Sequence, residues 1–298
     1  MYALIRFSAF LGLVLLTVAP GSAALITSVT DPTSNFHVIN FKNLNDPIAD
    51  QQTGQATADI VGNAANPGFY SEFDGTYLYY RVRFGATDIK QGVPTMQSQV
   101  FWIGIDANND GALDVFMAVD NSGSNNNLTF QDVGGGANTS PNSTTIVTAQ
   151  SQFTIAQNAS NYNYSSVSNV LDPTITSTDL NADGKTDAFL TFRVRFVSVS
   201  GEAGLQGALS TLAGINVTTA STFRYVIATS TQNNSLNQDL GGVNGGIGSS
   251  TTWVNLGALT NQMTINGLEV PEPGTFSCAA AGIALIGLRL FQQRRRNS

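Results

Sequence analysis

Apolar and polar residues alternate in many short stretches along the middle of the chain, and this pattern predicts β-strands with one buried face. In YRVRF, residues 80–84, the tyrosine, valine and phenylalanine point to one face and the two arginines point to the other. FRVRF, residues 192–196, repeats this alternation. Gly, Asn, Asp or Pro residues bound the strand candidates, which are 36–41, 77–84, 99–105, 113–119, 188–199, 223–229, 251–256 and 262–265. Many short strands separated by turn residues predict an all-β fold, a β-sandwich.

One stretch departs from this alternation and predicts a single short helix. In SGEAGLQGALSTLAG, residues 200–214, Leu205, Leu209 and Leu212 follow the spacing of one helix face. Gly214 stands where a C-cap glycine ends a helix. We expect this helix to lie over one end or edge of the sandwich.

The first 24 residues have the pattern of a secretory signal peptide. One charge, Arg6, precedes an apolar stretch at 7–18, and Pro20, Gly21 and small residues follow. An N-terminal membrane anchor is the alternative, but the apolar stretch is shorter than the ~20 residues that a spanning helix needs. We therefore expect export, with residues 25–268 forming one β-sandwich domain, because no break in composition divides them.

Charge and cysteine content restrict what this exported body can do. The chain has 13 Lys and Arg against 20 Asp and Glu, for a formal net charge of −7. An acidic protein lacks the basic face that nucleic acid needs, so we expect no nucleic-acid partner. The one cysteine, Cys278, lies near the C-terminus, and the body therefore has no disulfide. Its apolar core, bound metal or both must hold it together.

Two segments share the spacing D-x-N-x-D-G-x-x-D, which predicts a pair of calcium-binding loops. They are DANNDGALD, residues 106–114, and DLNADGKTD, residues 179–187. Calcium takes six to eight oxygen ligands, and oxygens at alternate positions of a tight loop can converge on one ion. The predicted ligands are Asp106, Asn108, Asp110, the carbonyl of Ala112 and Asp114 in the first loop, and Asp179, Asn181, Asp183, the carbonyl of Lys185 and Asp187 in the second.

The repetition of this spacing favours calcium over the alternative, two ordinary Asp-Gly turns whose side chains satisfy backbone donors. Position twelve of the loops is Met117 and Leu190, so neither loop has the bidentate glutamate of an EF-hand, and strands rather than helices flank both. The loops resemble the short aspartate-rich calcium loops of extracellular repeats. We expect structural calcium, bound with a modest affinity of about 10⁻⁴–10⁻³ M.

Catalytic residue types are scarce in the body, and we expect a protein that is not an enzyme. The one histidine, His37, lies in an alternating strand pattern and is interpreted as a half-buried strand residue. No spacing singles out a carboxylate pair from Glu72, Glu202 and the aspartates. A hydrolase with an unrecognised site stays open as a third hypothesis.

Arginines and aromatic rings offer two further interpretations. The pairs Arg81/Arg83 and Arg193/Arg195 could bind an acidic sugar, although a solvated face that meets aspartates across the sheet is the plainer interpretation. Aromatic rings could stack on sugars, although core packing is favoured for them. The rings considered are Tyr70, Tyr77, Tyr79, Trp102 and Trp253.

The C-terminal region, residues 269–298, has three parts in order. Pro271, Glu272 and Pro273 form an extended box, and an apolar run at 275–288 follows. Basic residues end the chain, and this cluster is Arg294, Arg295 and Arg296. The pattern predicts a short transmembrane helix with a positive cytoplasmic end, and a plain C-terminal anchor is the alternative.

All three parts resemble the PEP-CTERM sorting signal. The resemblance implies recognition and processing by an exosortase, a membrane cysteine peptidase of Gram-negative bacteria that make extracellular polysaccharide. It also implies export across the inner membrane, a transient anchor there, and delivery to the cell surface or extracellular matrix.

The body is loosely similar to secreted bacterial proteins in which an aspartate-rich loop separates two strands. GFYSEFDGTYLYYRVRF, residues 68–84, and FWIGIDANNDGALDVFMAVD, residues 101–120, carry this similarity. The layout resembles family-nine-like carbohydrate-binding sandwiches and implies a jelly-roll or carbohydrate-binding-module-like fold. The leading hypothesis is a non-enzymatic surface or matrix protein of a biofilm or exopolysaccharide. The alternative is a carbohydrate-binding module, with extracellular polysaccharide as its partner.

Overall fold

The computed structural model describes residues 26–41, 46, 50–51, 54–90, 93–95, 99–122, 126–139, 153–244 and 251–271. The predicted signal peptide and residues 272–298, with the apolar run and arginine cluster of the sorting signal, lie outside them. Within the described ranges, no helix combines the length and the apolar character that crossing a membrane requires.

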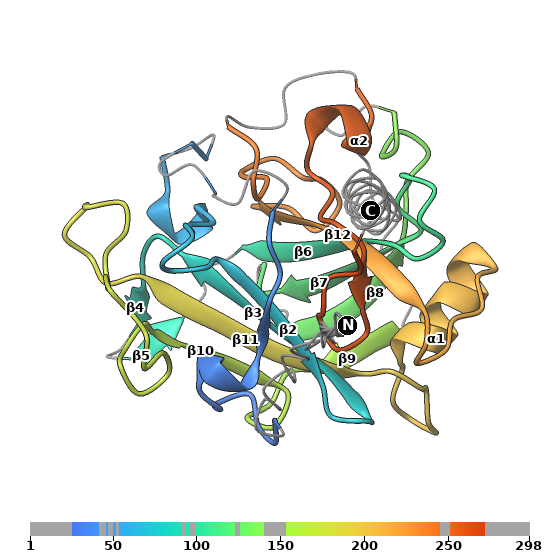
Figure 1. Cartoon of the computed structure of the whole chain (residues 1–298), viewed down its shortest axis with the longest axis horizontal. Helices are drawn as coiled ribbons and strands as arrows, with labels where there is room; N and C mark the ends of the chain where they lie inside the picture. Colours follow the sequence, from blue (N-terminus) through green and yellow to red (C-terminus); the bar gives the residue numbers. More distant parts are fainter. Residues whose placement is uncertain are drawn as a thin grey trace, which may run out of the picture.

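Two antiparallel sheets make up most of the fold and confirm the predicted all-β class, consistent with a β-sandwich. The five-stranded sheet has the order β1 (His37–Val38), β2 (Phe69–Phe73), β3 (Tyr77–Phe84), β11 (Ala188–Arg195) and β10 (Tyr162–Ser166). The six-stranded sheet has the order β13 (Met263–Thr264), β12 (Thr222–Ser230), β6 (Val100–Asp106), β7 (Val115–Asp120), β8 (Asn127–Asp132) and β9 (Thr154–Ala156). A separate hairpin pairs β4 (Asp88–Lys90) with β5 (Val93–Thr95). Figure 1 shows β2, β3 and β11 crossing β6, β7 and β8 as separate layers.

The core lies between the two sheets, where the inward faces of the alternating strands meet. The ring of Tyr80 on β3 contacts that of Tyr225 on β12, with centroids 5.9 Å apart. Phe84, at the end of β3, meets Phe101 on β6 edge to face at 5.8 Å. Burying each phenylalanine side chain stabilises the fold by about 1.5–3 kcal/mol, so these contacts between the sheets hold the sandwich closed.

The outer faces of both sheets are covered as well, which the alternating pattern does not predict. Residues 26–36 pack on the five-stranded sheet, where Tyr70, Tyr79 and Phe189 form a second apolar cluster. Trp102 and Trp253 belong to a third cluster on the six-stranded sheet. Each sheet is therefore buried on two faces over part of its area.

This covering explains why the expectation of a solvated arginine face is wrong for Arg81 and Arg83, which are both 0% exposed. Arg83 forms an ion pair with Asp187 at 2.5 Å. The guanidinium of Arg81 donates to the carbonyl of Asp31 at 2.6 Å and lies 4.4 Å from the ring centroid of Phe36. A meeting with an aspartate across the sheet is thus confirmed for Arg83, but in the interior.

The observed strand and helix boundaries show where the local sequence pattern is sufficient to predict an element. β3 coincides with the predicted 77–84, and β11 ends four residues before the predicted 199. The predicted strand at 251–256 is wrong, because Trp253–Leu256 forms the short helix α2. Thr252 caps it by accepting from the amide of Asn255, and Gly257 ends it in the left-handed conformation, with φ 75°.

The predicted helix at 200–214 exists but is shorter. It begins with α1 (Leu205–Ala208) and continues as the π-helical turn η5 (Leu209–Ala213). Gly214 ends it with φ 70°, as the sequence predicts. Residues 200–204 instead form a turn, because Glu202 pairs with Val199. Leu205 and Leu209 are buried in the main core.

Candidate metal sites

The first acidic loop, residues 106–114, joins β6 to β7 and is closed by its own backbone amides. The Asp106 carboxylate accepts from the amide of Asp110 at 3.2 Å and from that of Gly111 at 2.9 Å. The Asp110 carboxylate accepts from the amide of Ala112 at 2.8 Å. These bonds draw the predicted ligands around one turn.

The second acidic loop, residues 179–187, leads into β11 and repeats this arrangement position by position. The Asp179 carboxylate accepts from the amides of Asp183 and Gly184 at 3.2 and 3.0 Å. The Asp183 carboxylate accepts from the amide of Lys185 at 2.8 Å. The asparagine oxygens at position three, on Asn108 and Asn181, accept from the amide at position five in both loops.

The backbone follows the same path in the two loops. Position four is left-handed in each, with φ 62° at Asn109 and 56° at Ala182. Gly111 and Gly184 at position six have φ 90° and 80°. A left-handed alanine is uncommon, so its presence shows how strongly the surrounding hydrogen bonds fix this conformation.

Position nine separates the two loops electrostatically. Asp114 accepts from the amide of Ala107 at 2.7 Å, and Asp187 accepts from that of Leu180 at 3.2 Å. Only Asp187 also pairs with a buried arginine, Arg83. Burial raises the pKa of Asp187 to about 6, while Arg83 acts in the opposite direction.

The loops lie in different parts of the sandwich. Asn109 donates to the carbonyl of Thr222, where β12 begins. Asn181 donates at 3.0 Å to the carbonyl of Gly85, directly after β3. One loop therefore belongs to the six-stranded sheet and the other to the five-stranded sheet.

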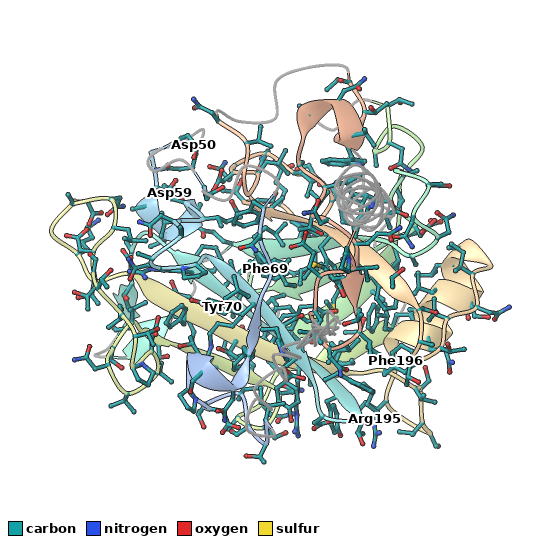
Figure 2. All side chains as sticks on the ribbon, in the orientation of Figure 1. Asp50, Asp59, Phe69, Tyr70, Arg195 and Phe196 are labelled. Carbon is teal, nitrogen blue, oxygen red and sulfur yellow. The ribbon has the colours of Figure 1, made fainter. Side chains whose placement is uncertain are left out.

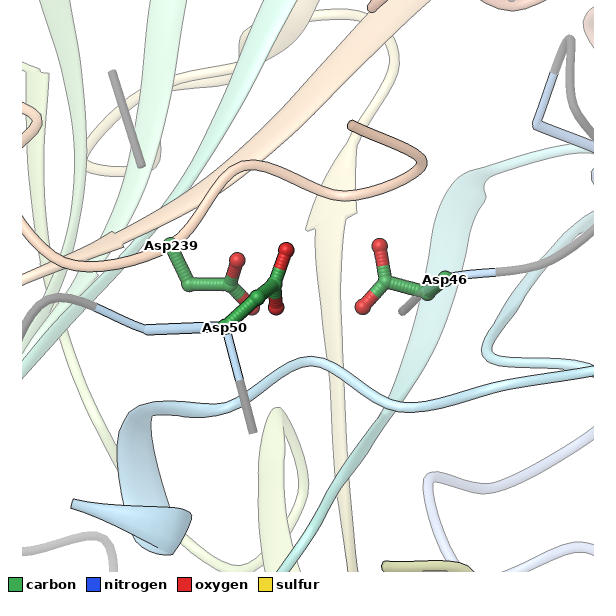
Figure 3. A group of neighbouring side chains, drawn as sticks. All are labelled: Asp46, Asp50 and Asp239. Carbon is green, nitrogen blue, oxygen red and sulfur yellow. The ribbon is translucent and has the colours of Figure 1, made fainter. Parts of the chain in front are cut away.

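A group of aspartates outside the loops was not anticipated from the sequence. Within the part of the chain that the structure describes, one group of three acidic side chains has ligand atoms that all lie within 4.8 Å of one another: Asp46, Asp50 and Asp239. Figure 3 shows the three carboxylates near one another, with Asp46 and Asp50 from one stretch of the chain and Asp239 from another. This group could hold a metal ion. Calcium at the twin loops stays a prediction.

Burial and mutual repulsion dominate this aspartate group. Asp46 and Asp239 are 3% and 1% exposed. Burial raises the pKa of Asp46 well above its usual value, and the charges of Asp239, Asp50 and Asp59 add to this. Burial likewise raises the pKa of Asp239, with Asp50 and Asp59 adding to the effect. No short spacing in the sequence signals this group, because its members come together only in the fold.

The other residues considered for chemistry lie apart from both kinds of site. His37 is half-buried on β1, as interpreted from the sequence, and its Nδ1 lies 2.6 Å from a carboxylate oxygen of Glu72 on β2. Arg195 pairs with Glu202 at 2.7 Å, and the guanidinium of Arg193 lies 4.1 Å from the ring centroid of Tyr77. Figure 2 places Arg195 far from Asp50.

Core packing, the favoured interpretation of the aromatic candidates, is confirmed for four of the five. Tyr70, Tyr79, Trp102 and Trp253 are buried, and Tyr77 is partly exposed. A surface hollow of about 610 Å³ is lined by residues that include Phe153, itself buried, and by polar residues such as Thr154, Ser198 and Glu202. The buried rings cannot stack on a sugar at the surface.

The chain was compared with protein-family models, with curated proteins and with solved structures, and no match was found.

Proposed function

We propose that the chain is a non-enzymatic protein of the cell surface or extracellular matrix, whose jelly-roll or carbohydrate-binding-module-like sandwich is stabilised by calcium in the twin loops. The observation that carries this proposal is the repeated geometry. Two loops of the same spacing, on different sheets, adopt the same hydrogen bonds and the same left-handed positions. The shared D-x-N-x-D-G spacing produces this geometry twice, and each copy presents the same set of oxygen donors.

Calcium is the ligand that this donor set favours. Each loop offers aspartate and asparagine side chains and a backbone carbonyl, and hard oxygen donors of this kind are those that calcium takes. Residues 25–268 contain no cysteine, so an exported body cannot use disulfides. Millimolar calcium outside the cell would fill sites of modest affinity and supply the missing cross-links.

Export and sorting rest on the two ends of the chain. The N-terminal 24 residues supply the secretory signal, and the sorting signal at 269–298 would deliver the chain to an exosortase-type peptidase. The protein would be held briefly in the inner membrane of a Gram-negative cell and then released to the surface. Extracellular polysaccharide is the matrix component that such a protein would meet.

Calcium-dependent stability tests the loop part of the proposal. In the full-length protein in detergent, calcium should raise the thermal midpoint, and the double variant Asp110→Asn/Asp183→Asn should lose most of that rise. Asparagine keeps the oxygen that accepts the loop amide and removes the charge that binds the ion. Asp74→Asn is the matched control, since Asp74 caps an Asp-Gly turn that lacks the loop spacing. An equal calcium response in the double variant and the parent would contradict the loop assignment.

Cell fractionation tests the sorting part. Alanine at Pro271, Glu272 and Pro273 should leave the chain unprocessed in the inner membrane and deplete it from the surface. A parallel Asp74→Asn strain controls for expression. Unchanged surface delivery would rule out recognition of the Pro-Glu-Pro box.

A further inference from the structure

Two stretches far apart in the chain meet at one end of the sandwich. Asp46 and Asp50 come from the stretch between β1 and the 3₁₀ turn η2 (Ala56–Ala58), and Asp59 directly follows that turn. Asp239 lies after β12, where its carbonyl accepts from the amide of Thr229 at 2.9 Å. Figure 2 shows Asp50 and Asp59 in the same region of the molecule.

This region joins the two sheets. Ile60 pairs with Phe84 at the end of β3, in the five-stranded sheet. The hydroxyl of Thr229 on β12, in the six-stranded sheet, donates to the carbonyl of Ala58 at 2.6 Å. The aspartate group therefore lies where one short segment bridges the two layers.

We propose that Asp46, Asp50 and Asp239 bind a calcium ion, at a site separate from the twin loops, that ties Asp46 and Asp50 to the segment after β12. The ligand atoms of the three side chains already lie within 4.8 Å of one another. One oxygen of Asp46, Oδ2, is buried without a hydrogen-bond partner. Figure 3 shows the carboxylate of Asp46 aimed at those of Asp50 and Asp239.

The charges at this site call for a cation. No lysine, arginine or histidine of the described residues forms an ion pair with Asp46 or Asp239. A buried carboxylate ordinarily takes up a proton, pairs with a cation or binds metal, because leaving water costs an isolated charge several kcal/mol. Asp187, which is equally buried, has Arg83. A divalent ion would compensate the negative charge of the aspartate group, as Arg83 compensates that of Asp187.

The donor set and its dimensions fit calcium. All three side chains are carboxylates, the ligand type that suits magnesium, calcium and manganese. Calcium binds oxygen at about 2.3–2.6 Å, so oxygens on opposite sides of the ion are up to about 5 Å apart. Magnesium, at about 2.0–2.1 Å, would require a spread of about 4 Å or less and near-ideal octahedral geometry.

Reciprocal hydrogen bonds already hold the site in shape. Asp239 accepts from the amide of Ile60 at 2.6 Å, and Asp46 accepts from the amide of Gly242. Each segment thus donates to a carboxylate of the other. An ion between the carboxylates would strengthen this contact between the two segments. Without the ion, repulsion between the carboxylates would weaken it.

Asp46→Asn tests the site, in a full-length background that already carries Asp110→Asn and Asp183→Asn. Calcium bound per chain is measured by equilibrium dialysis, and the thermal midpoint is measured in EDTA and in about 1 mM calcium. We expect Asp46→Asn to lose one bound calcium and the remaining calcium-dependent rise. In EDTA it should be more stable than its parent, because the new asparagine can still accept from Gly242 while its side-chain amide donates to the neighbouring carboxylates.

Asp120→Asn is the matched control, since Asp120 is buried but its carboxylate accepts from Ser122 in its own turn. Asp50→Asn, at a half-exposed position, replaces Asp46→Asn if the latter does not fold. Unchanged calcium content and an unchanged midpoint rise would overturn the proposal, and an equal response to magnesium would overturn the choice of calcium. The result is independent of the loops, because the loop substitutions are present in both proteins compared.

Discussion

The twin acidic loops and the buried aspartate group position several carboxylates in opposite ways. In each loop the acids lie within nine residues, and the loop amides donate to their oxygens. In the aspartate group the partners are distant, as for Ile60 and Asp239, which are 179 residues apart. There the backbone supplies fewer donors, and Asp46 keeps one oxygen without any.

The comparison shows that a well-formed loop and an uncompensated buried charge are separate properties. The loops are held by their own hydrogen bonds, so they can keep their shape before an ion binds. The aspartate group is held by the fold around it. Repulsion between its carboxylates therefore lowers the stability of the folded protein when no ion is present. We therefore expect calcium to bind at the loops without changing their shape. At the aspartate group, we expect it to remove the repulsion between the carboxylates.

The largest effect should come from removing the arginine partner of a buried aspartate. Arg83→Met leaves Asp187 buried without its partner and should lower the free energy of unfolding by about 3–5 kcal/mol. Urea denaturation measures the loss. The double variant Arg83→Met/Asp187→Asn should recover part of it, because no unpaired charge remains. An equal loss in both variants would show that packing of the arginine, and not charge, is decisive.

Asp239→Asn should lower the free energy of unfolding in EDTA by about 1–3 kcal/mol, the reverse of Asp46→Asn. Both oxygens of Asp239 accept from backbone amides, those of Ile60 and Leu240. In an asparagine, the side-chain NH2 group would face one of these amides, so that two donors meet. Urea denaturation of the two variants side by side provides the measurement. The same sign of change in both would contradict the assigned hydrogen bonds.

Without metal, the aspartate group should make the protein less stable as the pH rises. Asp46 and Asp239 have a raised pKa in the folded protein, so the folded state holds protons that the unfolded state releases above its ordinary pKa of about 3.9. From about pH 4 upward, each such carboxyl should lower the free energy of unfolding by about 1.4 kcal/mol per pH unit until its folded pKa is reached.

The measurement for this pH dependence is the difference between the parent and Asp46→Asn, by urea denaturation in EDTA at pH 4 and pH 7. Asp50 and Asp59 face the same group and contribute in both proteins. The parent should lose more stability than Asp46→Asn over this range. Parallel pH profiles would refute the role assigned to Asp46.

The smallest predicted effect is a difference in stability between glycine variants of the two loops. Gly184→Ala meets no atom within 4 Å and should cost only the left-handed strain of about 1–2 kcal/mol. Gly111→Ala should cost more, because its Cβ would lie 2.7 Å from Val254. Thermal melts in calcium compare the two variants. A greater loss for Gly184→Ala would contradict the geometry of the loops.

The parts of the fold that the sequence predicts are those whose cause is local. The alternation in residues 77–84 is sufficient for β3, and the left-handed Gly214 is sufficient for the end of the helix. The prediction fails at 251–256, where the cap at Thr252 outweighs the strand pattern. It also fails for Arg83, because residues distant in sequence bury it.

The candidate sites divide in the same way. The loop spacing is visible in the sequence because all of its donors are close neighbours. Asp46 and Asp239 carry no such signal, since the pairing of Ile60 with β3 and the contact of Ala58 with β12 bring their segments together. Only the tertiary structure reveals that Asp46 has a buried oxygen without a donor.

Anomalous X-ray diffraction from crystals of the protein grown in calcium tests the central claim most directly. We predict a calcium peak between Asp46, Asp50 and Asp239, with their carboxylate oxygens about 2.3–2.6 Å from it, and a peak in each acidic loop. Density without an anomalous peak between the three aspartates, at a calcium concentration that fills the loops, would contradict it.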